Sequence, residues 1–177
     1  MGRLTENSVL MMKNTSFSLT AQLVVPESGV EGVIVAQGGV SGGHSLYVKD
    51  GKPKYCYNFF GLERYYAEAT EKIPPGDHQV RMEFTYDGGG VGKGGTATLY
   101  LDGNPIGEGR IEQTEAFLFS ADETCDVGDE FGSPVTTDYS TKKFTGGIEW
   151  VEIELGEDDH NHLIKPEDRL NLAMGIQ

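Results

Sequence analysis

Four aspartates in the second half of the chain have the side chains and the spacing to hold a hard cation. Asp122, Asp126, Asp129 and Asp138 bracket a glycine-containing loop. Carboxylate oxygens on irregular backbone are the ligands that Ca²⁺ requires, so these four residues are candidate Ca²⁺ ligands, although their spacing is not that of an EF-hand. The alternative is a solvated acidic loop without metal, which would also keep sheet edges from pairing with one another.

A group of tyrosines lies close together in the first half of the chain. The candidate ligand-binding residues are Tyr47, Tyr55, Tyr57 and Tyr65, together with Asn58. Aromatic faces and a nearby amide can form a platform on which a sugar ring stacks. Tyrosine is also favoured in strands, so packing in a core or an interface is the alternative. An open concave face around Tyr57 would favour sugar binding, and a flat apolar patch would favour docking against another domain.

Other residues that could do chemistry give weaker patterns. Glu152 and Glu154 share one face of an expected strand, about 7 Å apart by strand rise, but glutamates on the solvent side of a strand are ordinary. The glycine-rich loop 88–95 leads into an expected strand instead of a helix, so it lacks the helix N-terminus that binds a nucleotide phosphate. No Ser-His-Asp or Cys-His arrangement stands out. The sequence therefore predicts no catalytic residue.

The charge of the chain restricts its partners. The formal net charge is −14, from 28 acidic and 14 basic residues, and no basic patch is present, so nucleic acid is not an expected partner. No segment is long and apolar enough to span a membrane, and the polar start lacks the apolar core of a signal peptide. The compartment stays open. Cys56 and Cys125 are expected to be half-buried free thiols.

The elements that must position these residues are strands. Alternation of apolar and polar residues predicts strands over residues 17–25, 32–37, 44–49, 54–59, 64–69, 79–86, 96–101, 116–120 and 147–155. Asp50-Gly51 and Asp102-Gly103 predict tight hairpin turns. In the last strand Val151, Ile153 and Leu155 are expected to face the core.

Composition supports the same fold class. With 25 glycines, eight tyrosines and eight phenylalanines in 177 residues, the chain is typical of an all-β protein with many short antiparallel strands, a sandwich or a barrel. We expect one β-sandwich domain over residues 1–155, large enough to bury a core. Residues 156–177 are expected to form an acidic tail with a short helix over 166–174, in which His160 and His162 are surface histidines.

Five segments form a combination that is more specific than any single motif. They are residues 31–39 (EGVIVAQGG), 45–48 (SLYV), 57–61 (YNFFG), the glycine-rich loop and 126–135. Together they resemble the C-terminal region of bacterial arylsulfatases, and the similarity covers nearly the whole chain. In that family the region follows an alkaline-phosphatase-like catalytic domain and is similar to laminin-G and concanavalin A-like jelly rolls.

The resemblance implies a role without chemistry. Sulfatases need Cys or Ser in a C/S-x-P-x-R motif, and none of the seven prolines here has Cys or Ser two positions before it. The expected function is a non-catalytic accessory domain that packs on a sulfatase catalytic domain or supplies contacts on its substrate side. The alternative is an independent, lectin-like carbohydrate-binding module, with a Ca²⁺ ion as its expected cofactor.

Overall fold

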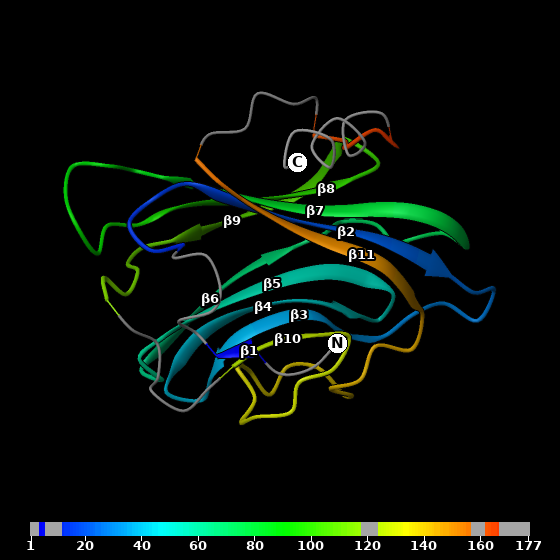
Figure 1. Ribbon diagram of the computed structural model, residues 1–177, viewed down its shortest axis with the longest axis horizontal. Coiled ribbons are helices and arrows are strands. Elements are labelled where there is room, and N and C mark those ends of the chain that lie inside the picture. Colours follow the sequence, from blue (N-terminus) through cyan, green and yellow to red (C-terminus); the bar gives the residue numbers. More distant parts are fainter. Residues whose placement is uncertain (1–3, 6–11, 118–123, 157–161, 167–177) are drawn as a thin grey trace, which may run out of the picture.

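The computed structural model describes residues 4–5, 12–117, 124–156 and 162–166, which form two antiparallel sheets stacked face to face (Figure 1). The six-stranded sheet has the order β1-β10-β3-β4-β5-β6. Its strands are β1 (Leu4–Thr5), β10 (Thr124–Val127), β3 (Gly32–Gly39), β4 (Gly42–Lys49), β5 (Lys52–Phe59) and β6 (Glu63–Glu68). The all-β sandwich that the sequence predicts is confirmed.

The five-stranded sheet has the order β11-β2-β7-β8-β9. Its strands are β11 (Gly147–Leu155), β2 (Phe17–Val25), β7 (Gly76–Tyr86), β8 (Gly95–Leu101) and β9 (Asn104–Ile111). The first strand of this sheet in the sequence, β2, therefore pairs with the last, β11. This pairing between distant segments places β11 at one edge of the sheet.

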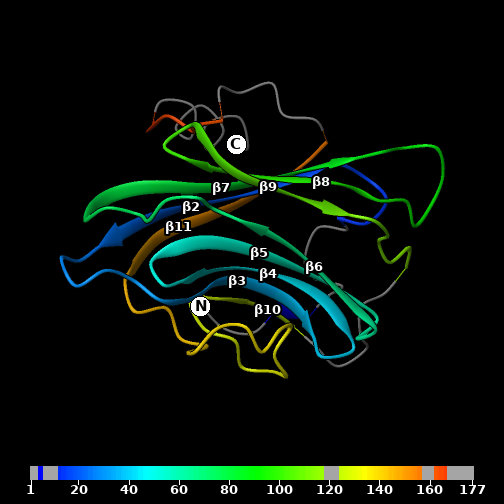
Figure 2. The ribbon, with the colours of Figure 1, turned by 180° about the vertical axis from the view of Figure 1, so that it is seen from behind.

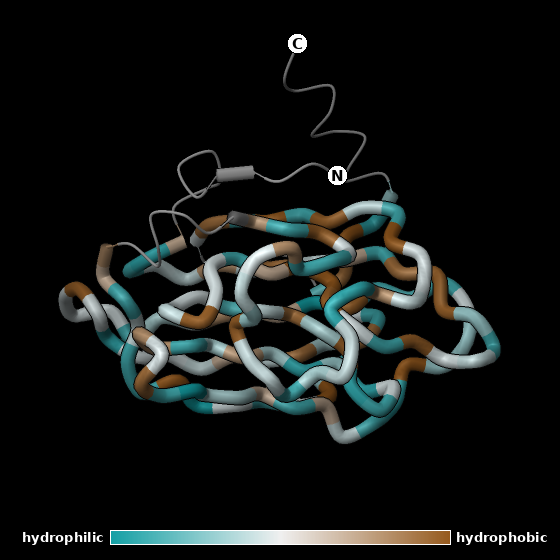
Figure 3. The backbone as a smooth tube through the Cα atoms, turned by 90° about the horizontal axis from the view of Figure 1, so that it is seen from below, coloured by the Kyte–Doolittle hydropathy of each residue, from teal (hydrophilic) through white to brown (hydrophobic). Residues whose placement is uncertain are grey.

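The hydrophobic core fills the space between the sheets. Along β2 the inward residues Phe17, Leu19, Ala21, Leu23 and Val25 are all buried, as the period of two predicts. Hydrophobic and hydrophilic residues alternate along much of the tube in Figure 3. Every residue of β3 is buried, so this strand is covered on both faces.

Each sheet also has an outer face that is partly covered. Residues 128–146 run beneath the six-stranded sheet (Figure 2) and pack there as a second, smaller hydrophobic cluster. That cluster consists of Val33, Ala36, Tyr47, Cys56, Val135 and Tyr139. The described part of the predicted tail, residues 162–166, lies on the outer side of the five-stranded sheet, through contacts with β7 and β8. No described residues form a helix long and apolar enough to cross a membrane.

The two predicted Asp-Gly turns are confirmed, and a third turn of the same kind appears. Asp50 and Asp102 have φ values of 52° and 50°, each followed by a glycine with positive φ, as type I′ turns require. Between β5 and β6 the corresponding residues are Phe60, with φ 52°, and Gly61. A bulky side chain at such a φ is strained.

The structure corrects the sequence-based strands at three places. Ala116 and Phe117 form a bend instead of a strand, because Glu115 is tied to the β5–β6 turn, and the rest of the expected strand lies outside the described residues. Cys125 belongs to the short strand β10, which pairs with β3, where an irregular loop was expected. Leu155 is 44% exposed, whereas Val151 and Ile153 face the core as predicted.

The predicted helix over 166–174 lies outside the described residues except for its first residue.

Candidate functional site: the outer face of the five-stranded sheet

The tyrosines predicted to form a sugar platform lie in the interior. Tyr55, Tyr57 and Tyr65 point into the main core, and Tyr47 into the smaller cluster on the other side of the same sheet. Their exposed fractions are 0% for Tyr47 and Tyr55, 4% for Tyr57 and 8% for Tyr65. A sugar cannot stack on a ring whose faces are already covered, so these rings form packing, not an exposed platform.

Asn58 and Tyr57 instead hold neighbouring loops in place. The Asn58 amide donates to the carbonyls of Gly39 and Val40 at 2.8 and 3.1 Å and accepts from the Gly61 N–H at 2.9 Å. The Tyr57 hydroxyl accepts from the Glu115 N–H at 2.8 Å. Burial raises the pKa of Tyr57 far above its ordinary value, so the hydroxyl stays protonated. Both residues therefore position loops, and neither side chain is accessible to a ligand on the surface.

Of the four predicted cation ligands, the three that the structure describes do not converge. Asp138 accepts from Lys49, Lys54 and the Tyr47 hydroxyl at 2.6, 2.7 and 2.7 Å. Asp126 is buried, and its Oδ2 accepts a hydrogen bond from the Phe131 N–H at 3.2 Å. Among the residues that the structure describes, no three His, Cys, Asp or Glu side chains could share a metal ion. Asp122 lies outside that part of the chain, and a Ca²⁺ site that includes it with Asp126 and Asp129 stays a prediction.

Hydrogen bonds to Asp138 fix its charge. Burial by itself would raise the pKa of this carboxyl, but hydrogen bonds from Lys49, Lys54 and Tyr47 outweigh burial and hold the pKa well below its usual range. Asp138 is therefore an ionised anchor that fastens the acidic loop to the six-stranded sheet. Two ammonium groups already neutralise it, which removes the charge that a cation would need.

The two cysteines are free thiols, as predicted, and both are buried, not half-buried. Burial raises the pKa of Cys56 to about 12 and that of Cys125 to about 11. Because the thiolate is the nucleophile, both side chains are unreactive packing groups at neutral pH.

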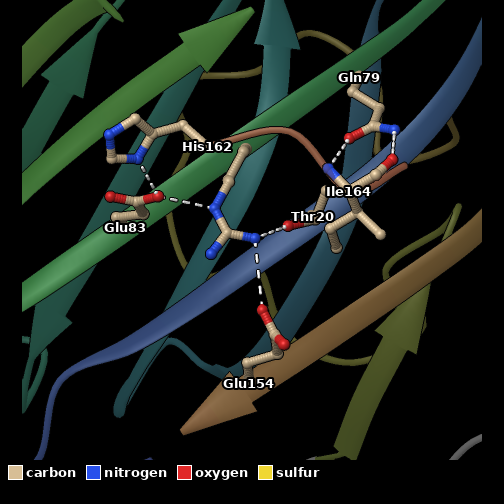
Figure 4. Close-up of polar contacts among 7 residues, drawn as sticks. Thr20, Gln79, Glu83, Glu154, His162 and Ile164 are labelled. Carbon is tan, nitrogen blue, oxygen red and sulfur yellow. Dashed lines mark hydrogen bonds and ion pairs between the residues drawn. The ribbon is translucent and has the colours of Figure 1, made fainter. Parts of the chain in front are cut away.

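A buried arginine on the outer face of the five-stranded sheet is the centre of a polar network that the sequence did not indicate. Arg81 projects from β7 and is 1% exposed. Its Nε pairs with Glu83 Oε1 at 2.7 Å, and its Nη1 donates to Thr20 Oγ1 at 2.6 Å and approaches Glu154 Oε2 at 3.5 Å (Figure 4). A buried charge needs such partners, since an unpaired one would be costly.

A short segment of the tail, residues 162–165, lies across this network, and we call it the strap. The His162 ring stacks on Tyr100 with centroids 4.2 Å apart and planes 9° apart, and its Nδ1 lies 2.7 Å from Glu83 Oε1. The Gln79 side chain holds both backbone groups of Ile164 (Figure 4): Nε2 donates to its carbonyl at 2.6 Å, and Oε1 accepts from its N–H at 3.0 Å. The strap is thus fixed along β7.

Beside the strap lies a hollow of about 230 Å³ lined by Ser16, Phe17, Ser18, Glu83, Phe84, Thr85 and Gly156. Its polar lining consists of three hydroxyl groups and one carboxylate. Arg81 and His162 both contact Oε1 of Glu83. The arrangement can accept and donate hydrogen bonds to a small polar ligand.

The sequence contained only an indirect signal for this site. The outward residues of β2 and β7, including Ser18, Thr20, Gln79, Arg81 and Glu83, were visible as the polar half of an alternating pattern. Glu154 was singled out with Glu152 as a carboxylate pair, and the structure places it beside Arg81 instead. His162 was expected on the surface; its side chain is 40% exposed, and it also stacks on Tyr100.

A second feature is one end of the six-stranded sheet, where the β3–β4 turn and the β5–β6 turn lie side by side (Figures 1 and 2). The Val40 N–H donates to Ser133 Oγ and the Phe60 N–H donates to Glu115 Oε1, which joins these turns to two neighbouring loops. The Asn58 amide of β5 donates to the Val40 carbonyl. The large hydrophobic side chains exposed on these four segments are Val40, Phe60, Leu62, Phe117 and Phe131, at 51%, 50%, 84%, 80% and 58%. We call this set the apolar loop end.

Comparison with known proteins identifies the fold. No family model matches the sequence, and no curated protein matches it. Among solved structures, the native heptameric SAP-like pentraxin from Limulus polyphemus aligns with a TM-score of 0.51 at 17% identity, over 86% of this chain and 70% of the pentraxin. The CBM40 of Ruminococcus gnavus IT-sialidase bound to α2,3-sialyllactose aligns with a TM-score of 0.54 at 12% identity, over 89% of this chain and 82% of the CBM40. The chain shares the jelly-roll fold of these structures.

Domains LG4-5 of the mouse laminin α1 chain share this jelly roll, with a TM-score of 0.55 at 12% identity. The alignment covers 89% of this chain but 40% of the laminin chain. The predicted laminin-G-like jelly roll is therefore confirmed. The comparisons give no link to arylsulfatases.

Proposed function

We propose that this jelly roll is a carbohydrate-binding, lectin-like module, and that the hollow beside the strap receives a sugar. The observation that carries the proposal is the lining of the hollow by hydroxyls and the Glu83 carboxylate. The fold supports it, because the CBM40 of the Ruminococcus gnavus sialidase, a structure with the same fold, holds sialyllactose. Fold alone is a weak warrant for function, so the proposal rests on the hollow.

The chemistry of the hollow suits a neutral sugar. Glu83 Oε2 accepts hydrogen bonds from sugar hydroxyls, and bonds to an ionised acceptor are stronger than those between neutral groups. Ser18 and Thr85 both donate and accept. At about 230 Å³ the hollow is smaller than the roughly 300–1,000 Å³ of sites for drug-sized ligands, which fits one sugar ring. The net charge of −14 disfavours strongly anionic ligands.

The Thr85→Trp variant tests this proposal. Thr85 is exposed at the rim of the hollow, so an indole there fills the space without disturbing the core. Thr137→Trp makes the same change at an exposed position below the other sheet. On a glycan array the wild type and Thr137→Trp should bind the same glycans, and Thr85→Trp should lose them. Equal binding by all three proteins would exclude the hollow as the sugar-binding site.

A second candidate is the accessory role that the resemblance to arylsulfatases implies. The apolar loop end supports it, because exposed apolar groups on one end of a domain favour docking against another domain. In this role the chain packs on a sulfatase catalytic domain and has no activity of its own. An arylsulfatase assay of the isolated chain should show no turnover above buffer, and saturable hydrolysis would overturn the non-catalytic assignment.

A Ca²⁺ ion is proposed only for a site that includes Asp122, Asp126 and Asp129. Binding to the folded state alone would stabilise that state, by an amount that grows with the logarithm of the ion concentration once it exceeds Kd. A chelator should then lower the melting temperature. A melting temperature that does not change would show that no Ca²⁺ ion stabilises the fold.

A further inference from the structure

The strap makes contacts that resemble those of a sugar. The His162 ring lies parallel to Tyr100 at a centroid distance of 4.2 Å. A flat ring laid on the face of a tyrosine is also how an aromatic side chain receives an apolar sugar face. The imidazole thus covers a platform of the kind that the buried tyrosines of β5 and β6 do not provide.

Gln79 makes the second contact of this kind. Its amide donates to one group of Ile164 and accepts from another, at 2.6 and 3.0 Å. Two neighbouring sugar hydroxyls offer the same pair, because each hydroxyl can donate or accept. An amide on a strand that binds a backbone N–H and C=O together is therefore equally suited to a vicinal diol.

Glu83 connects these contacts to the hollow. Its Oε1 contacts His162 in the strap, and the same side chain lines the hollow. Gln79, Glu83 and Thr85 follow one another on the outer face of β7, so the hollow and the strap occupy consecutive parts of one strip. A sugar chain that extends from the hollow toward Gln79 would meet the strap.

We propose that the strap occupies, within the same molecule, a second sugar subsite formed by Tyr100, Gln79 and Glu83. An oligosaccharide bound in the hollow displaces the strap and takes its contacts, whereas a monosaccharide leaves it in place. The inference rests on the proposed function of the hollow. Because the strap competes with the ligand, the apparent affinity for an oligosaccharide is lowered by the fraction of molecules in which the strap is bound.

His162→Ala tests the inference by uncovering Tyr100. The control is His78→Ala, since the His78 Nδ1 also lies 2.7 Å from a carboxylate, that of Asp102, but away from the subsite. Both variants and the wild type are measured on an array that carries the same sugars as monosaccharides and as tetrasaccharides. We expect His162→Ala to bind tetrasaccharides about 3- to 10-fold more tightly, with monosaccharide binding unchanged, and His78→Ala to match the wild type.

A second variant loosens the strap without changing the subsite. Ile164→Pro removes the N–H that donates to Gln79 Oε1. It should therefore raise the affinity for tetrasaccharides and leave monosaccharide binding unchanged. In the wild type, a bound tetrasaccharide should speed hydrogen exchange at the Ile164 amide. If both variants bind tetrasaccharides with the affinity of the wild type, the second subsite is overturned, whereas the proposed sugar site in the hollow is not. Absence of glycan binding by the wild type and by every variant would overturn the proposed function itself, and the subsite with it.

Discussion

The side-chain amide of Gln79 on β7 holds the backbone of Ile164, a residue 85 positions later in the chain, through two hydrogen bonds of 2.6 and 3.0 Å. Ile164 is 4% exposed and Gln79 is 8% exposed. The strap is therefore part of the folded domain, because water does not replace these bonds readily once both partners are buried.

The first prediction concerns this pair. Gln79→Ala leaves the buried N–H and C=O of Ile164 without their partner, which should lower the free energy of unfolding by about 1–3 kcal/mol. Gln22→Ala, at the paired position on β2, is the control and should change it by less than about 0.5 kcal/mol. Urea denaturation measures both. Equal losses would mean that the strap adds nothing to stability.

Asp138 should make stability depend on pH in the acid range. Its pKa is lowered in the folded protein, so its stabilising contribution is fully present above the ordinary value of 3.8 and is lost as pH falls below it. Asp138→Asn should therefore be less stable than the wild type at pH 7, and the difference should shrink below about pH 4. The control is Asp77→Asn, at an exposed position of β7. A difference that is constant from pH 7 to pH 3 would contradict this assignment.

The turn between β5 and β6 should be improved by substitution. Phe60 has φ 52° and its ring is 50% exposed, and a non-glycine residue in this region is strained by about 1–2 kcal/mol. Asn tolerates such a φ and is preferred in type I′ turns, so Phe60→Asn should raise the melting temperature. A lower melting temperature would show that the contact of Phe60 with Phe59 outweighs the strain.

Leu99 tests the register of the five-stranded sheet. Its side chain on β8 is fully buried, so Leu99→Ala should lower the free energy of unfolding by about 2–5 kcal/mol. Leu62→Ala removes the same atoms from a side chain that is 84% exposed, and it should cost less than about 0.5 kcal/mol. Similar losses in chemical denaturation would mean that Leu99 is not in the core.

Local pattern determined the strands and most of the turns. The period of two in residues 17–25 and 96–101 led to β2 and β8, and Asp50-Gly51 and Asp102-Gly103 led to their turns, because strand faces and positive φ are properties of a few adjacent residues. The nearly continuous apolar run over residues 32–37 also indicates a strand covered on both faces, and β3 is buried throughout. Four residues of β10 were too few to show an alternation, and that strand was missed.

Which face of a strand is covered was decided by tertiary structure. The tyrosines of β4, β5 and β6 read equally well as platform or core, and only the second sheet and the segment 128–146 settle that they are buried. Arg81 and Gln79 read as ordinary outward polar residues until a segment some 80 positions away covers them. The candidate site arises from pairing and covering between distant parts of the chain, and short-range residue patterns contain no information about such contacts.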